Sequence, residues 1–183
     1  MPAEPTIWTS QFSGFGGAAY LDCAAQGPFP KEAAEAVRGA LRCKEHPEEL
    51  PETLFEELPA RVREAAARLI GCSPASIALG SGASHGLNVA ALGLPLKSGD
   101  EVVLAQGEFP ANVYPWLNRE SDGIRVRFVR PEGGPIVDAA AMIREIGPRT
   151  RVVSVSLGAF ATGYRGDIKA LAEACRERGA FFV

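Results

Sequence analysis

The amino-acid sequence predicts an α/β protein in which helices flank a mostly parallel sheet. From residue 76 onward, short apolar runs alternate with stretches that have helical spacing. Two of the runs, residues 101–105 and 152–155, are apolar except for Glu101 and Ser154, as is typical of strands buried on both faces. This alternation of strands and helices favours a parallel sheet joined by right-handed crossovers.

The first 75 residues have a different organisation. Residues 1–30 are rich in Gly, Pro and Ala, which predicts an extended arm with a short strand at residues 20–22. Apolar positions at helical spacing predict helices over residues 31–43 and 54–70, and the polar segment 44–52, with two prolines, predicts a loop. We therefore expect an N-terminal arm over residues 1–30, a helical segment over 31–75 and an α/β domain over 76–183.

Within the α/β domain, residues 76–79, 101–105, 125–129, 152–155 and 180–183 are predicted strands. The alternation in residues 125–129 favours a position near an edge, whereas residues 180–183 are continuously apolar and favour a central one. Helices are predicted over residues 84–93, 110–119, 138–146 and 167–178. The last has the clearest signals, with Asp167 at its N-cap, Leu171 and Cys175 on its buried face and Gly179 at its end.

Composition and charge exclude several classes of partner. A net charge of −3, with no cluster of Lys and Arg, argues against nucleic acid. No apolar run approaches the roughly 20 residues of a membrane helix, and the first residues lack the pattern of a signal peptide. Four widely spaced cysteines predict neither zinc nor a disulfide framework. These features favour a cytoplasmic protein whose cysteines are reduced.

A glycine-rich turn at residues 80–86 carries the first functional signal. It follows a predicted strand and opens a predicted helix, so its free backbone N–H groups favour binding of a phosphate. The turn lacks the Gly-Lys-Ser/Thr of a nucleotide phosphate loop. Gly80, Gly82 and Gly86 approximate a dinucleotide fingerprint, but the next strand does not end in the acidic residue that holds a ribose. A nicotinamide-dependent dehydrogenase therefore stays a minor alternative.

Three segments, residues 20–28, 81–88 and 107–116, carry a resemblance to a known family. They resemble the N-terminal part of the class V aminotransferase-like group of fold-type I pyridoxal phosphate enzymes, which includes cysteine desulfurases, selenocysteine lyases and isopenicillin-epimerase-like proteins. The resemblance implies a fold-type I large domain that is incomplete at its C-terminal end. It also implies pyridoxal 5′-phosphate as cofactor, a small amino acid as substrate, and a homodimer.

The resemblance also implies roles for particular residues. Gly82, Ala83, Ser84 and His85 would form the phosphate turn, and Phe109 would stack on the cofactor ring, where many desulfurases have a histidine. In the N-terminal arm, which would close over the active site, Ala25 and Gln26 would contact the substrate.

Other positions depart from the family pattern. Ala159 and Phe160 stand where family members often present Asn or Gln to the pyridine hydroxyl. The ring-nitrogen aspartate and the Schiff-base lysine are expected beyond Val183, so no catalytic residue is assigned and the 183 residues alone are expected to be inactive. The lysines present lie on helices or at the wrong end of a strand; they are Lys31, Lys44, Lys97 and Lys169.

The branch of chemistry stays open between a desulfurase or related lyase, an aminotransferase and an epimerase. A non-catalytic relative that acts by binding or dimerising is the main alternative to an enzyme, and the amide-free positions Ala159 and Phe160 favour it somewhat.

Overall fold

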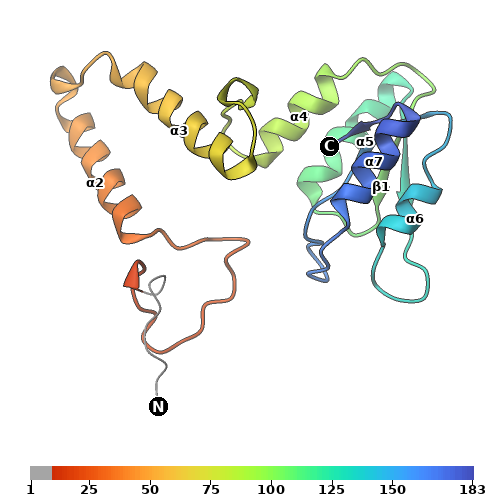
Figure 1. The fold of residues 1–183 in the computed structure, drawn as a ribbon, viewed down its shortest axis with the longest axis horizontal. Coiled ribbons are helices and arrows are strands. Elements are labelled where there is room, and N and C mark those ends of the chain that lie inside the picture. Colours follow the sequence, from red (N-terminus) through yellow and green to blue (C-terminus); the bar gives the residue numbers. More distant parts are fainter. Residues whose placement is uncertain (1–9) are drawn as a thin grey trace. The chain divides into compact units, whose positions relative to one another are not determined.

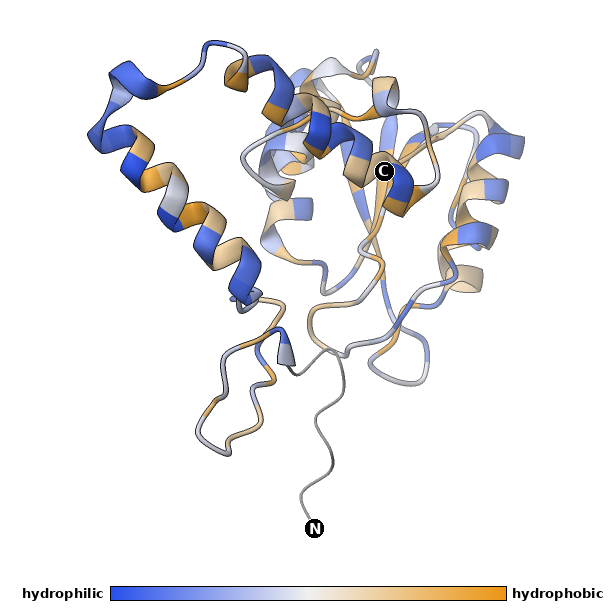
Figure 2. Cartoon of the chain, turned by 60° about the vertical axis from the view of Figure 1, so that its left-hand side comes forward, coloured by the Kyte–Doolittle hydropathy of each residue, from blue (hydrophilic) through white to orange (hydrophobic). Residues whose placement is uncertain are grey.

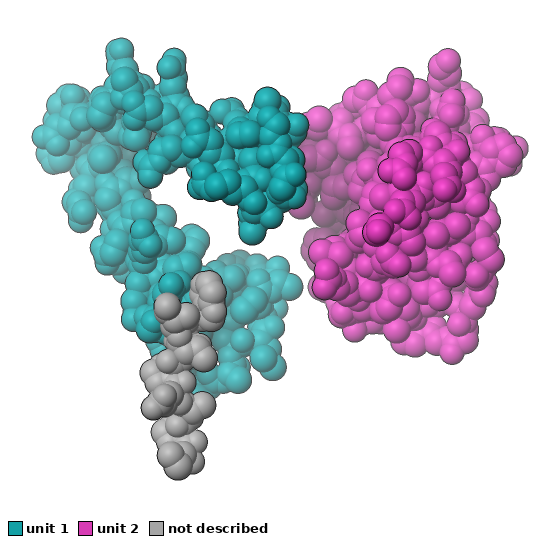
Figure 3. All heavy atoms as spheres, in the orientation of Figure 1, with its two compact units in different colours: residues 1–78 teal, residues 79–183 magenta. Residues whose placement is uncertain are grey.

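A computed structural model describes residues 10–183 of the chain (Figure 1). These residues form two compact units, divided between residues 78 and 79 (Figure 3). The first nine residues of the predicted N-terminal arm lie outside the described residues.

The first unit is helical. Its elements are α2 (Lys31–Glu45), a 3₁₀ helix (Pro47–Glu49), α3 (Leu54–Ile70) and a second 3₁₀ helix (Pro74–Ser76). Both predicted α-helices are confirmed. α3 ends at Gly71, whose φ of 79° is a left-handed conformation that terminates the helix at little cost for a glycine.

The prediction of a strand at residues 20–22 is wrong. The Tyr20 hydroxyl instead donates hydrogen bonds to the carbonyl oxygens of Asp22 and Gln26, at 3.3 and 2.8 Å. The backbone N–H groups of Ala25 and Gln26 both donate to the Asp22 carbonyl oxygen. A strand requires a neighbouring strand for its backbone groups, whereas this local turn satisfies several of them without one.

The apolar side chains of α2 and α3 stay largely exposed within the first unit. In its described part only Ala67 is buried, and Phe55 and Leu69 are 69% and 89% exposed. Both helices carry hydrophobic positions interspersed with hydrophilic ones (Figure 2). The sequence periodicity therefore predicts these helices correctly, although the first unit by itself contains almost no core.

The second unit is built on a parallel sheet of four strands in the order β2–β1–β3–β4. The strands are β1 (Glu101–Ala105), β2 (Arg125–Val129), β3 (Thr150–Ser154) and β4 (Phe181–Phe182). The edge position predicted for residues 125–129 is confirmed. The central position predicted for residues 180–183 is wrong for the described sheet. β4 lies at its edge, pairs only with β3, and Phe181 is 44% exposed.

The strand predicted at residues 76–79 does not form. Ile77 has the extended dihedral angles φ −98° and ψ 116°, but residues 77–80 are assigned no regular structure. Extended backbone becomes a strand only when another strand accepts its hydrogen bonds, and none of residues 10–183 does so here.

Alternate side chains of the central strands pack on opposite faces of the sheet. Val103 and Val153 lie in one core cluster, which also contains side chains of α6 (Ala139–Arg144) and α7 (Ile168–Arg178). Val102, Leu104 and Val152 lie in the other, with side chains of α4 (Ala83–Gly93) and α5 (Tyr114–Leu117). Helices therefore cover both faces, as predicted from the continuously apolar strands.

The helix ends follow the sequence signals closely, with one exception. The Asp167 carboxylate accepts from the Ala170 N–H at 3.0 Å at the start of α7, and Gly179 ends that helix with φ 67°. The helix predicted over residues 110–119 is instead divided into a 3₁₀ helix, α5 and a second 3₁₀ helix. Pro115 lacks an N–H and cannot bond back to residue 111, which disfavours a continuous helix. None of the helices within residues 10–183 is both long and apolar enough to cross a membrane.

Candidate functional site

Two loops follow the carboxyl ends of the neighbouring strands β1 and β3, where open parallel sheets commonly place their ligands. A carboxylate joins these loops. One oxygen of Glu108 accepts from the Ser156 backbone N–H at 2.8 Å; the other accepts from the Ser156 hydroxyl at 2.5 Å and from the Asn112 side-chain amide at 3.1 Å. The two strand ends are therefore connected by hydrogen bonds to a charged group, which are stronger than neutral ones.

Below this carboxylate lies a buried polar cluster. The Asn112 side-chain oxygen accepts from the Ser154 hydroxyl at 2.5 Å and from the Trp116 indole N–H at 3.5 Å. Asn112 is 6% exposed, and Ser154 and Trp116 are fully buried. The cluster joins β3 to α5, so the loop after β1 is held from two sides.

Phe109 directly follows Glu108, and Phe160 lies in the loop after β3. Their rings form an edge-to-face pair with centroids 5.1 Å apart and an interplanar angle of 66°. Both rings keep much of their surface in contact with solvent, 47% of Phe109 and 70% of Phe160. The pair therefore presents an apolar corner at the carboxyl ends of the strands.

The start of α4 supplies backbone donors. Gly82 stands at the N-cap and no side chain caps the helix. The first intrahelical bonds run from the His85 and Gly86 N–H groups to the Gly82 carbonyl oxygen, so the N–H groups of Ala83 and Ser84 precede the intrahelical ladder. Free N–H groups at a helix N-terminus favour an anion.

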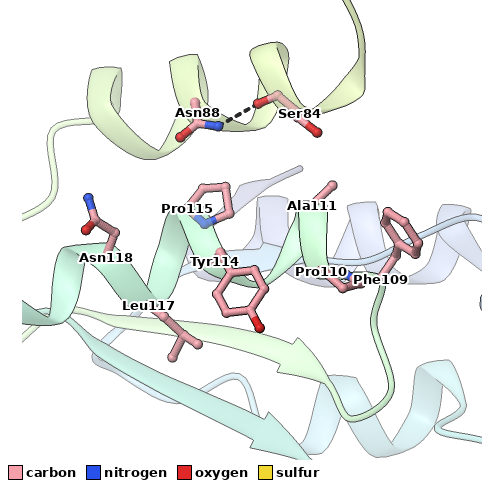
Figure 4. Close-up of a pocket in the computed structure, with 9 residues that line it drawn as sticks. All are labelled: Ser84, Asn88, Phe109, Pro110, Ala111, Tyr114, Pro115, Leu117 and Asn118. Atoms are coloured by element: carbon pink, nitrogen blue, oxygen red, sulfur yellow. Dashed lines mark hydrogen bonds between the residues drawn. The ribbon is translucent and has the colours of Figure 1, made fainter.

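A cavity of about 580 Å³ lies between α4 and the segment that follows β1 (Figure 4). Its lining contains no charged side chain and combines apolar rings with hydroxyl and amide groups. The lining residues are Ser84, Asn88, Phe109, Pro110, Ala111, Tyr114, Pro115, Leu117 and Asn118. Ser84 and Asn88 face the segment that carries Ala111 and Phe109, and the Asn88 amide donates to the Ser84 carbonyl oxygen at 2.8 Å (Figure 4).

The structure brings Ser84 and Phe109 together in the lining of one cavity, although they are 25 positions apart in the sequence. Gly82 and Ala83 lie at the adjoining helix start. The His85 ring packs against the Gly80 backbone, where an added Cβ would lie 2.8 Å from its Cδ2 atom. Ala25 and Gln26 are exposed and lie in the turn of the first unit, so they keep only their predicted role.

Sequence reasoning did not single out the polar side chains that hold this region together: Glu108, Asn112, Ser154 and Ser156. The spacing of Glu108 and Asn112 was visible, because a carboxylate and an amide four positions apart lie close on a helical turn. Their contacts with Ser154 and Ser156, 42 and 48 positions away, could not be read from spacing.

Ala159 and Phe160 lie in a loop that closes on itself. The Ala159 N–H donates to the Tyr164 carbonyl oxygen at 2.8 Å, and Gly158 and Arg165 form an antiparallel bridge. Gly163 adopts a φ of 68° inside this turn, a conformation that favours glycine. The loop thus has a defined shape, and it carries the exposed ring of Phe160.

Comparison with known proteins gives a consistent result. A family model described as aminotransferase class-V matches residues 19–183. The chain is 32% identical over 166 residues to isopenicillin N epimerase of Streptomyces clavuligerus, an alignment that covers 87% of this chain and 41% of the relative. It is 28% identical to a probable cysteine desulfurase of Pseudomonas aeruginosa, over 97% of this chain and 47% of the relative.

Solved structures show the same fold. The cystine C–S lyase C-DES, in complex with its reaction product cysteine persulfide, matches with a TM-score of 0.81 at 24% identity, covering 94% of this chain and 47% of that one. The cysteine desulfurase CsdA from Escherichia coli matches with a TM-score of 0.79 at 22% identity, covering 98% and 47%. The chain spans less than half the length of each of these four proteins.

Proposed function

Because the chain belongs to the aminotransferase class-V family, we propose that it supplies the cofactor-phosphate and ring-binding part of a pyridoxal phosphate enzyme acting on a small amino acid. The observation that carries the proposal is the shared cavity of Ser84 and Phe109. It combines a helix start, which favours a phosphate, with an exposed aromatic ring, which favours a planar heteroaromatic ligand.

The residues present fit this cofactor. The uncapped start of α4 offers N–H groups for a dianion, and the cavity lining contains no carboxylate that would repel it. Phe109 is 47% exposed and so has free surface for stacking. The cavity volume of about 580 Å³ falls in the range typical of small-molecule sites.

Bound pyridoxal phosphate supplies an electron sink for the amino-acid substrate. The residues of this chain would bind the cofactor and orient it. The Ala83 and Ser84 N–H groups and the Ser84 hydroxyl would hold the phosphate, and Phe109 would stack on the cofactor ring. Phe160, which packs edge-on against Phe109, offers no hydrogen bond from its side chain and would add apolar surface next to the ring. Ala25 and Gln26 keep the role that the family resemblance implies for them, which is to contact the substrate.

The names of the relatives support an amino-acid substrate but divide between reactions. They include a cysteine desulfurase, an epimerase and a C–S lyase. The proposal therefore keeps the desulfurase or lyase, aminotransferase and epimerase branches. We also propose that the protein is a homodimer and that it acts in the cytoplasm. Sedimentation of the purified protein as a monomer at micromolar concentration would count against the dimer.

A second candidate is a relative that binds the cofactor or a partner without catalysis. The observation that favours it is Phe160, which packs edge-on against Phe109 at a position where an amide is common in the family pattern. Such a protein would keep the fold and the phosphate turn without turning over an amino acid.

The two candidates separate in one experiment on the naturally produced protein. After incubation with pyridoxal phosphate, borohydride reduction and intact mass measurement, the enzyme is expected to carry a covalent pyridoxyl group. A protein that binds the cofactor saturably but is never covalently labelled would support the non-catalytic relative. A protein with no saturable binding of pyridoxal phosphate would refute the enzyme and the cofactor-binding relative, and would leave only a relative that binds a partner. Hydride transfer with an oxidised nicotinamide cofactor would establish the dehydrogenase instead.

A further inference from the structure

The contact between Glu108 and Ser156 joins the two loops that carry the aromatic pair. Both atoms of the Glu108 carboxylate are used, and they accept bonds from the Ser156 N–H, the Ser156 hydroxyl and the Asn112 amide. All three donors are neutral. The carboxylate therefore acts as a bracket between the strand ends rather than as one half of an ion pair.

Each of the two bonded residues, Glu108 and Ser156, is close in the sequence to one of the aromatic residues. Phe109 is the next residue after Glu108, and Phe160 follows Ser156 by four positions. The segment between Ser156 and Phe160 is held by the bond from the Gly166 N–H to the Leu157 carbonyl oxygen at 3.0 Å, and by the bridge between Gly158 and Arg165. A shift of either loop at the bracket would therefore move one ring relative to the other.

The rings themselves bury too little surface to set this arrangement. Phe109 and Phe160 are 47% and 70% exposed, and they touch only edge to face. Hydrogen bonds to a half-buried carboxylate are stronger than one such contact between exposed rings. The arrangement of the pair follows from the bracket, and the contact of the rings is its consequence.

We propose that Glu108 is a positioning residue that fixes Phe109 and Phe160 as a preorganised apolar corner for the cofactor ring. This inference rests on the proposed function, because it assumes that the corner receives pyridoxal phosphate. Without the hydrogen bonds between Glu108 and Ser156, the two loops would be less ordered before the cofactor binds. Binding would then include the entropic cost of ordering them, which lowers the affinity.

The test compares two carboxylate-to-amide variants in the naturally produced protein. In Glu108→Gln an N–H₂ group replaces an accepting oxygen, so at least one of the three bonds is lost. The control is Glu132→Gln. The Glu132 carboxylate is exposed, pairs with Arg144 at 2.8 Å and does not line the cavity. We expect the dissociation constant for pyridoxal phosphate to rise about tenfold in Glu108→Gln and to stay unchanged in the control.

Two further readouts distinguish positioning from a general loss of stability. The circular dichroism band of the bound cofactor is expected to weaken at saturating cofactor in Glu108→Gln, because it depends on the ring's surroundings. In a background that carries both Phe109→Ala and Phe160→Ala, Glu108→Gln is expected to have no further effect on binding, since Glu108 acts through these two rings. Additive effects, or an unchanged dissociation constant in Glu108→Gln, would overturn the inference.

If Glu108→Gln fails to fold, Ser156→Ala tests the positioning role of Glu108 instead. It removes only the hydroxyl bond at 2.5 Å and leaves the backbone bond in place, so a smaller weakening in the same direction is expected. Unchanged binding in Ser156→Ala would then overturn the inference. A wild-type protein that binds no pyridoxal phosphate would refute the proposed function itself.

Discussion

Substitution of Asn112 by leucine is expected to destabilise the second unit by leaving a buried hydroxyl without its acceptor. The Asn112 side-chain oxygen accepts from Ser154 at 2.5 Å, and Ser154 is fully buried and cannot bond to water instead. Leucine has the branched shape of asparagine but a larger volume, so crowding at this buried position adds to the loss of hydrogen bonding.

The magnitude follows from the partners. An orphaned buried hydroxyl costs about 1–3 kcal/mol. The Trp116 indole contributes little because its bond is 3.5 Å long. Glu108 is half-buried and keeps its bonds to Ser156. We therefore expect Asn112→Leu to lower the free energy of unfolding by about 2 kcal/mol, a midpoint shift of roughly 4–8 °C for a protein of this size.

The assay is urea denaturation of wild type, Asn112→Leu, Ser154→Ala and the double variant. Replacing both partners of a buried hydrogen bond by apolar groups is nearly neutral, so the double variant should be more stable than the sum of the single losses predicts, by at least about 1 kcal/mol. Strictly additive losses would refute the reasoning, because they would mean that Asn112 and Ser154 do not stabilise each other.

Other predictions concern the cofactor, a helix cap and a thiol. Ser84→Asp places a carboxylate beside a dianionic phosphate and should weaken pyridoxal phosphate binding at least about tenfold in a fluorescence titration. Ser121→Asp, on the exposed turn after α5, is the matched control, and unchanged affinity in Ser84→Asp would remove Ser84 from the site. Asp167→Ala removes the cap of α7 and should cost about 1 kcal/mol in urea denaturation; no loss would show that the bond to Ala170 is not stabilising. Burial raises the pKa of the Cys175 thiol, partly offset by Arg178, so at pH 8 a thiol reagent should label three exposed cysteines quickly and Cys175 only on unfolding. Because the raised pKa favours the protonated thiol in the folded state, this contribution to stability is present below the unfolded pKa and is lost as the pH rises through the folded one. Rapid labelling of a fourth thiol in native protein would contradict the burial.

Local patterns determined most of the second unit. Continuous apolar runs placed β1 and β3 in a two-sided core, and the alternation in β2 placed it at an edge. Asp167 and Gly179 marked the ends of α7 because capping depends on neighbouring residues alone. The glycine-rich turn marked the start of α4 for the same reason.

The errors arose where a prediction needed a partner. Residues 20–22 and 76–79 have strand-like composition, but a strand forms only against another strand, and the described residues provide none. The helix predicted over residues 110–119 is divided for a local reason, because Pro115 has no N–H to donate within it.

The sequence by itself determined the fold class, the family resemblance and the residue types at the phosphate turn, since these depend on order along the chain. Only the tertiary structure placed Ser84 beside Phe109, paired Phe109 with Phe160, and joined their loops through Glu108 and Ser156. These contacts link positions 25 to 51 residues apart, and packing of the strands and helices, rather than any local preference, brings such positions together.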